Sequence, residues 1–218
     1  MKFKPEDDRP RVLISGAASG AGLACAHAFA EQGAELILTD WDGIALTRVA
    51  KELRAFSRFC DAGAERSVDI FVEELAGRFG SIDVLINAAG RAYVRALTMM
   101  RMSRAALPLL RRGRGYRLIA NIAPGGGFST CETIFPYAGS FASFARLSET
   151  LVDQCRGTDI EVACITPRIV RARQGSSRWS DHLYRLDRVD EQEAAQRIVE
   201  MFAAERPEWM PRQTSRLG

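Results

Sequence analysis

The feature that most constrains this chain is a glycine-rich stretch near its start, residues 11–22, which reads Arg-Val-Leu-Ile-Ser-Gly-Ala-Ala-Ser-Gly-Ala-Gly. Val12–Ile14 is a short apolar run of the kind that a buried parallel strand requires. Three glycines follow with G-x-x-x-G-x-G spacing, and an apolar helical pattern opens at Leu23. Such glycines permit a tight turn and let the backbone approach a pyrophosphate, while the helix N-terminus offers free N–H groups and partial positive charge. The sequence therefore predicts a dinucleotide site that includes Gly16, Ser19, Gly20 and Gly22.

Composition favours one domain of α/β type spanning residues 1–218, because 218 residues with 47% hydrophobic content can fill a single large core. The net charge of +3 is mild and predicts no nucleic acid partner. No run of 18 apolar residues occurs, so we expect no transmembrane helix. Residues 1–10 form a polar extension without an apolar signal region, and the five cysteines lack C-x-x-C spacing, which predicts reduced thiols in the cytoplasm. His27 and His182 lie too far apart to indicate a metal site.

The remaining chain alternates between apolar runs typical of strands and longer periodic stretches typical of helices. After the first strand and helix, strands are expected at 35–39, 56–60, 82–86, 116–122 and 160–165, with a last short strand at Trp209. Helices are expected at 43–54, 65–79, 93–111, 135–155 and 191–204. This alternation predicts a parallel, doubly wound sheet with right-handed crossovers. The arginine-rich residues 168–188 are expected to be an irregular lid over the substrate.

An acidic residue, Asp40, ends the second expected strand. In a dinucleotide site, such a carboxylate accepts hydrogen bonds from both hydroxyls of the adenosine ribose and repels a 2′-phosphate. Asp40 therefore favours NAD(H) over NADP(H). The competing interpretation is an ordinary aspartate at a strand end.

Four motifs together resemble the short-chain dehydrogenase/reductase family: residues 15–22, Asp40, Asp61-Ala62 and Asn87-Ala88-Ala89-Gly90. The resemblance covers about residues 10–205. It implies a single Rossmann-type domain with a parallel seven-stranded sheet, strand order 3-2-1-4-5-6-7, and helices on both faces. It also implies that Asp61 and Ala62 lie by the adenine, that Asn87, Ala89 and Gly90 lie beside the cofactor, and that helices four and five build an oligomer interface.

The family transfers hydride between nicotinamide and a carbonyl or alcohol, using a Tyr-x-x-x-Lys pair, a serine and an asparagine. The matching tyrosine is Tyr137, but Phe141 stands at the lysine position, Pro124 at the serine position and Arg95 at the asparagine position. A tyrosine with an ordinary pKa of about 10 is only about 0.1% ionised at neutral pH, so the loss of the adjacent lysine is serious. Arg168 also replaces the usual glycine after Pro167, where a long side chain would crowd the nicotinamide.

Three functions stay open, and the sequence favours the first. In the first, the chain is a catalytically inactive or impaired subunit that serves as a structural or regulatory partner, pairing through helices four and five with itself or with an active homologue. In the second, it is an NAD(H)-dependent oxidoreductase that uses Tyr137 with an arginine such as Arg95, Arg168 or Arg171. In the third, Tyr137 acts as an acid in a non-redox elimination or isomerisation, with an acidic substrate bound by Arg168, Arg171, Arg173 and Arg178. The nucleotide loop either still binds NAD(H) or is a relic of the fold.

Overall fold

The computed structural model describes residues 9–90, 94–123, 131–166, 169–170, 191–206 and 209, with side chains for all of these except 131–142, 166, 169 and 170. Its strands are β1 (Arg11–Ser15), β2 (Glu35–Asp40), β3 (Phe56–Phe59), β4 (Val84–Asn87), β5 (Arg117–Ile122), β6 (Ile160–Thr166) and β7 (Ile169–Val170). Its helices are α1 (Gly20–Glu31), α2 (Gly43–Leu53), α3 (Glu65–Arg78), α4 (Arg95–Arg111), α5 (Cys131–Cys155) and α6 (Glu191–Glu205). The strand order is β3-β2-β1-β4-β5-β6-β7, as the family resemblance implies.

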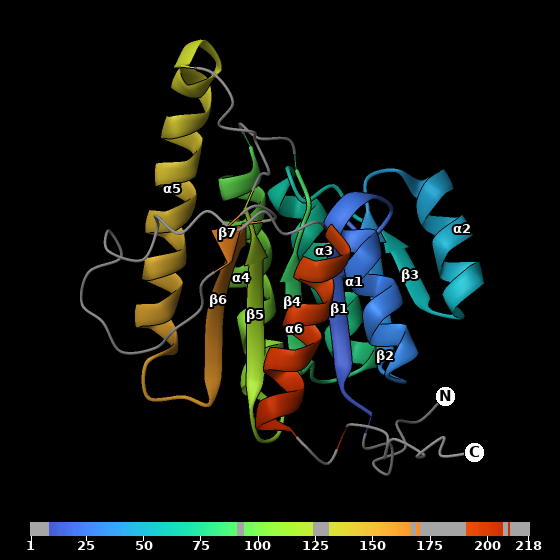
Figure 1. Ribbon diagram of the computed structural model, residues 1–218. Coiled ribbons are helices and arrows are strands. Elements are labelled where there is room, and N and C mark those ends of the chain that lie inside the picture. Colours follow the sequence, from blue (N-terminus) through green and yellow to red (C-terminus); the bar gives the residue numbers. More distant parts are fainter. Residues whose placement is uncertain are drawn as a thin grey trace, which may run out of the picture.

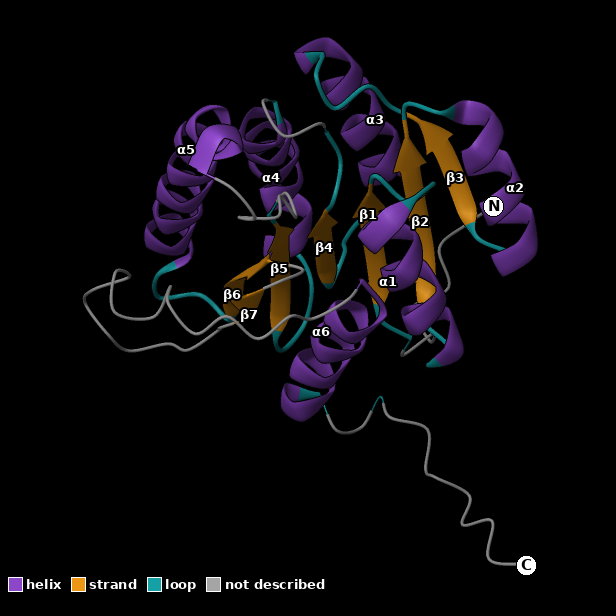
Figure 2. Ribbon diagram, turned by 45° about the horizontal axis from the view of Figure 1, so that its top comes forward, coloured by secondary structure: helices purple, strands orange, loops and turns teal. Residues whose placement is uncertain are grey.

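Helices cover both faces of the sheet because the central strands are apolar on both sides (Figures 1 and 2). Val12 and Ile14 of β1 belong to the core cluster that α1, α2 and α6 build on one face. Leu13, between them, belongs to the cluster that α3 and α4 build on the other face. Successive residues of a strand point to opposite faces, so one continuous apolar run serves both cores. A smaller cluster, which includes Phe144 of α5, extends the second core.

The seventh strand differs from the all-parallel sheet that we expected. β1 to β6 are parallel, but β7 pairs antiparallel with β6, with Ile165 opposite Val170. It is two residues long and takes them from the stretch expected to be irregular; the rest of 168–188 lies outside the described residues. β7 therefore occupies the sheet edge that a later parallel strand would need.

The last strand expected at Trp209 is also wrong, since this residue lies in a turn after α6. Its indole stacks on Phe29 of α1 at 5.6 Å between ring centroids and meets the edge of Phe202 of α6 at 5.2 Å. Burying a large aromatic ring between two helices removes apolar surface from water and adds favourable ring–ring contacts. Trp209 is therefore packed against the helical layer and not paired with the sheet.

Helix α5 begins earlier than the sequence suggests, at Cys131 and not near Phe135. Pro136 therefore lies inside the helix, where its missing N–H removes one backbone hydrogen bond. Tyr137 consequently lies in the second turn of α5. Among the described residues, no helix combines the length and apolar character needed to cross a bilayer.

Candidate nucleotide site at the carboxyl ends of the strands

The turn between β1 and α1 packs too tightly to admit side chains at two of its glycines. Gly16 has φ +86°, and a Cβ there would lie 2.6 Å from the backbone nitrogen of Ala89. A Cβ on Gly22 would lie 2.0 Å from the carbonyl oxygen of Gly16. The N–H groups of Gly16 and Ala17 donate to the carbonyl oxygen of Thr39 at 2.9 and 3.1 Å. The turn is thereby fixed against β2 and against the segment after β4, as a loop that carries a dinucleotide requires.

Asp40 lies at the carboxyl end of β2 and is only 5% exposed. One carboxylate oxygen accepts the N–H of Ala18 at 2.9 Å, and the other accepts the N–H of Asp42 at 3.0 Å. The carboxylate therefore orders the glycine turn itself. Each carboxylate oxygen retains a lone pair and can accept a hydrogen bond from a further donor. The contact of Asp40 with an adenosine ribose stays a prediction.

The residues after β3 are placed at the same end of the sheet. Asp61 is exposed, and its Oδ1 accepts the N–H of Gly63 at 2.8 Å, which closes a local turn. Ala62 is buried in the core cluster beneath α3. Arg101 of α4 donates to the carbonyl oxygen of Gly63 and so ties this turn to the next layer. No local sequence pattern singles out Arg101, because its partner lies 38 residues away.

The motif after β4 is held by buried polar contacts. Asn87 donates through Nδ2 to Ser103 Oγ and to Asn121 Oδ1, both at 2.8 Å, which joins β4 to α4 and β5. Asn121 in turn donates to Ser148 Oγ of α5 at 3.2 Å. The carbonyl oxygen of Ala89 accepts the hydroxyl of Thr98 at 2.9 Å. Gly90 follows with φ +100°, a conformation that side chains disfavour.

Arg95, at the position where the resemblance expects asparagine, begins α4 and folds back over the strand ends. Its guanidinium donates to the carbonyl oxygens of Gly90 at 3.0 Å, Ile122 at 3.3 Å and Ala123 at 3.5 Å. Burial lowers the pKa of this guanidinium, and the nearby charge of Glu191 raises it in part. The structure thus places a cation, and not a neutral amide, at the carboxyl ends of β4 and β5.

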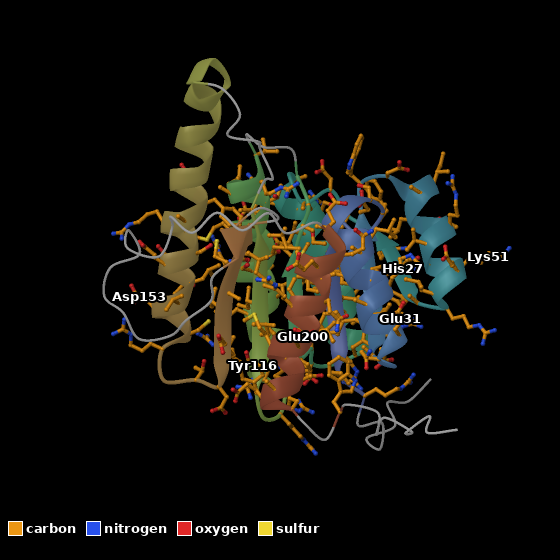
Figure 3. All side chains as sticks on the ribbon, in the orientation of Figure 1. His27, Glu31, Lys51, Tyr116, Asp153 and Glu200 are labelled. Carbon is orange, nitrogen blue, oxygen red and sulfur yellow. The ribbon has the colours of Figure 1, made fainter. Side chains whose placement is uncertain are left out.

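The other predicted catalytic positions fall on parts of the chain that are not fully described. Pro124 lies outside the described residues, and only the backbone of Tyr137 and Phe141 is described, within α5. Arg168, Arg171, Arg173 and Arg178 also lie outside. Within the described part of the chain, the one lysine is Lys51, on α2 at the far side of the molecule from α5 (Figure 3). It is therefore not a substitute for the lysine missing at Phe141.

Ser19 precedes α1 in an extended conformation, and its side chain makes no capping hydrogen bond. The first turn of α1 carries no acidic residue of its own. Glu191 of α6 lies near this helix end, with its Oε1 3.2 Å from the position that a Cβ of Gly20 would take. No local sequence pattern predicts this proximity, because Glu191 lies close to Gly20 in space but far from it along the chain. Among the described residues, no group of three or more His, Cys, Asp or Glu side chains is arranged to hold a metal ion.

Comparison with known proteins gives one consistent result. The family model for short chain dehydrogenases matches residues 10–100. An uncharacterized oxidoreductase of Staphylococcus saprophyticus is 28% identical, with 84% of this chain and 88% of the relative covered. A putative ketoacyl reductase of granaticin polyketide synthase from Streptomyces violaceoruber is 27% identical, with 88% and 78% covered.

Solved structures show the same fold. A short-chain dehydrogenase/reductase from Burkholderia phymatum in complex with NAD superposes with a TM-score of 0.73 at 21% identity, covering 91% of this chain and 87% of that one. A metagenomic short-chain oxidoreductase in complex with NADP gives a TM-score of 0.70 at 20% identity, with 88% and 90% covered. Together with the glycine turn, Asp40 and the Asn87–Gly90 segment, these matches support a protein of the short-chain dehydrogenase/reductase type, with the fold of that family.

Proposed function

We propose that this chain is a nucleotide-binding family member whose own hydride transfer is impaired or lost, and that it acts as a structural or regulatory subunit beside an active homologue. The proposal separates two halves of the site. The half expected to hold adenosine keeps the family's architecture, and the half expected to hold nicotinamide and substrate departs from it.

The adenosine half supports binding of a nicotinamide nucleotide, with NAD(H) favoured over NADP(H). The turn around Gly16 and Gly22 leaves no room for side chains, which suits close approach of a pyrophosphate. Asp40 places a negative charge at the end of β2, where a 2′-phosphate would be repelled. Relatives of the same fold have been solved with NAD and with NADP, so the fold accommodates both cofactors.

The observation that carries the proposal is Arg95. The family uses an asparagine here to hold a water in its proton relay, and an arginine cannot accept a hydrogen bond from that water. Its guanidinium is instead directed to the carbonyl oxygens of Gly90, Ile122 and Ala123. With Phe141 at the lysine position and Pro124 at the serine position, three of the four catalytic residue types are changed.

A partner subunit would bind along α4 and α5. Leu97 of α4 is 47% exposed and Val152 of α5 is 37% exposed, although both are large and apolar. Scattered exposed apolar residues are common, but these two lie on the helices through which the family assembles. We place the protein in the cytoplasm, where its scattered cysteines would stay reduced.

Calorimetric titration with NADH, NADPH and ADP-ribose tests the binding half. We expect NADH and ADP-ribose to bind with similar affinity and NADPH to bind at least tenfold more weakly, about 1.4 kcal/mol. Similar affinity for NADH and ADP-ribose means that the nicotinamide half contributes little. No binding of any of the three would contradict the proposal.

Turnover assays with a panel of alcohols and carbonyls test the catalytic half. We expect no turnover from the unaltered chain and a gain of activity when Arg95→Asn, Pro124→Ser and Phe141→Lys are combined. One observation favours a second function, an oxidoreductase with an altered relay: Arg95 does supply a cation at the strand ends. Activity of the unaltered chain that disappears in Tyr137→Phe would establish that function and overturn the first. Turnover without any nicotinamide cofactor would instead indicate a non-redox reaction.

A further inference from the structure

The carboxylate of Glu191 lies over the N-terminus of α1. Its two oxygens lie 3.2 and 3.9 Å from the position that a Cβ of Gly20, the first residue of that helix, would take. In a dinucleotide site of this kind, the negative group beside these first-turn N–H groups is the pyrophosphate of the cofactor. In this chain, a carboxylate from a different helix lies close to that place.

The position of Glu191 is set by tertiary packing and not by the local chain. α6 lies alongside α1 with Glu191 at its first residue (Figures 1 and 2). Ala194, Ala195, Ile198 and Phe202 are buried against the core that α1 shares, and the rings of Phe29 and Phe202 are 6.4 Å apart. Glu191 itself is exposed at the end of this buried face, so its side chain can rotate without disturbing the packing.

The surroundings of Glu191 are electropositive. The first turn of α1 has no acidic residue and receives no side-chain cap from Ser19, so its N–H dipoles are not balanced locally. Glu191 also begins α6 and lies at the positive end of that helix. On the other side, its charge acts on the Arg95 guanidinium, which is held over the carboxyl ends of β4 and β5. The positive ends of two helices and the charge of Arg95 therefore act on a single carboxylate.

We propose that Glu191 is an internal anion that occupies the pyrophosphate position, so that a nucleotide must displace its carboxylate in order to bind. This inference rests on the proposed nucleotide site and adds how that site is regulated. Without a nucleotide, the Glu191 carboxylate then occupies the site. The affinity for a dinucleotide is set by competition between this carboxylate and the pyrophosphate for the same positive region. Neutralising Glu191 removes one competitor and leaves the receptor groups in place.

Calorimetric titration of the full chain with ADP-ribose and with adenosine tests the competition. The variant is Glu191→Gln, which keeps the shape of the side chain and removes its charge. The matched control is Glu193→Gln, which removes a charge from the same helical turn at a residue that pairs with Arg197. We expect Glu191→Gln to bind ADP-ribose about tenfold more tightly than the unaltered chain, because the helix ends and Arg95 become available to the pyrophosphate. Adenosine, which has no phosphate, should bind equally to both.

The outcomes separate this inference from the proposed function. If the unaltered chain binds ADP-ribose and Glu191→Gln binds it no more tightly, the internal anion is disproved while the nucleotide site stands. The same holds if Glu193→Gln gives an equal gain, because the effect would then be one of overall charge. If only Glu191→Gln binds, the competition is strong and both ideas are supported. If neither chain binds ADP-ribose although both show a folded circular dichroism spectrum, the proposed nucleotide site is wrong and the inference falls with it.

Discussion

At the scale of single residues, the tightest contact of the nucleotide turn is the one that a Cβ atom on Gly22 would make. That atom would lie 2.0 Å from the carbonyl oxygen of Gly16, so Gly22→Ala forces backbone to move. We expect the free energy of unfolding to fall by about 3 kcal/mol, the upper range for overpacking of a tight site. The control is Gly77→Ala in α3, where nothing lies within 4 Å and alanine favours the helix by about 0.5–1 kcal/mol. Urea denaturation of both variants measures the difference, and equal stabilities would contradict the packing described for the turn.

At the scale of secondary-structure elements, Asn121 joins β5 to β4 and α5 through its side chain. It accepts from Asn87 at 2.8 Å and donates to Ser148 at 3.2 Å, and both Asn87 and Asn121 are buried. Asn121→Ala leaves one donor and one acceptor unsatisfied in a dry interior, so we expect a loss of about 2–3 kcal/mol in the free energy of unfolding. Ser103→Ala removes only one of the two acceptors of Asn87 and should cost about 1 kcal/mol. Chemical denaturation measures both losses; a smaller loss for Asn121→Ala than for Ser103→Ala would mean that the network does not hold these elements together.

At the scale of the whole molecule, Cys25 reports on global unfolding because it lies at the centre of one core face. Burial raises the pKa of its thiol from 9.0 to about 12. In the unfolded chain the thiol ionises first, so its contribution to stability is complete below pH 9 and declines as the pH rises toward 12. Between pH 9 and 10.5 we expect up to about 2 kcal/mol of this contribution to be lost. Denaturation at pH 9 and at pH 10.5 measures how far the free energy of unfolding falls between these pH values. In Cys25→Ala the fall should be smaller by the contribution of this thiol. An identical pH dependence in the two proteins would show that Cys25 does not remain neutral in the folded chain.

Assembly is the second property of the whole molecule that can be measured directly. If α4 and α5 form the proposed interface, light scattering should give a particle of at least twice the chain mass of 24.1 kDa, alone or with an active homologue. Leu97→Glu places a charge on the exposed face of α4 and should reduce the particle to a single chain without lowering its thermal midpoint. The control is Ile44→Glu, which places the same charge at an exposed residue of α2, outside the proposed interface. A monomer that stays monomeric with every partner tested would contradict the interface.

The sequence was sufficient for the layers of the fold because its signals there are local. Apolar runs such as Val12–Ile14 mark strands, and glycine with helical periodicity marks the turn into α1. The sequence was insufficient for β7 and Trp209. Both placements depend on tertiary packing, at the sheet edge for β7 and against the helical layer for Trp209. Within the candidate site, Asp40 and the glycines could be chosen from spacing alone. Arg95 could be aligned, but its bonds to Ile122 and Ala123 are tertiary contacts that no local pattern encodes.

The central position of β1 also has a consequence for synthesis of the chain. β1 leaves the ribosome before β2 and β4, yet β4 is one of its two neighbours in the sheet, with Val12 opposite Val84. Until that segment has been translated, the nascent chain can pair β1 with β2 alone, and the other edge of an apolar strand stays open. Pairing across such a long loop is slow, and open strand edges are where chains associate wrongly. The segment that carries the nucleotide turn is thus synthesised early but obtains its second strand partner late. During that interval we expect chaperones to bind mainly to the segment around β1.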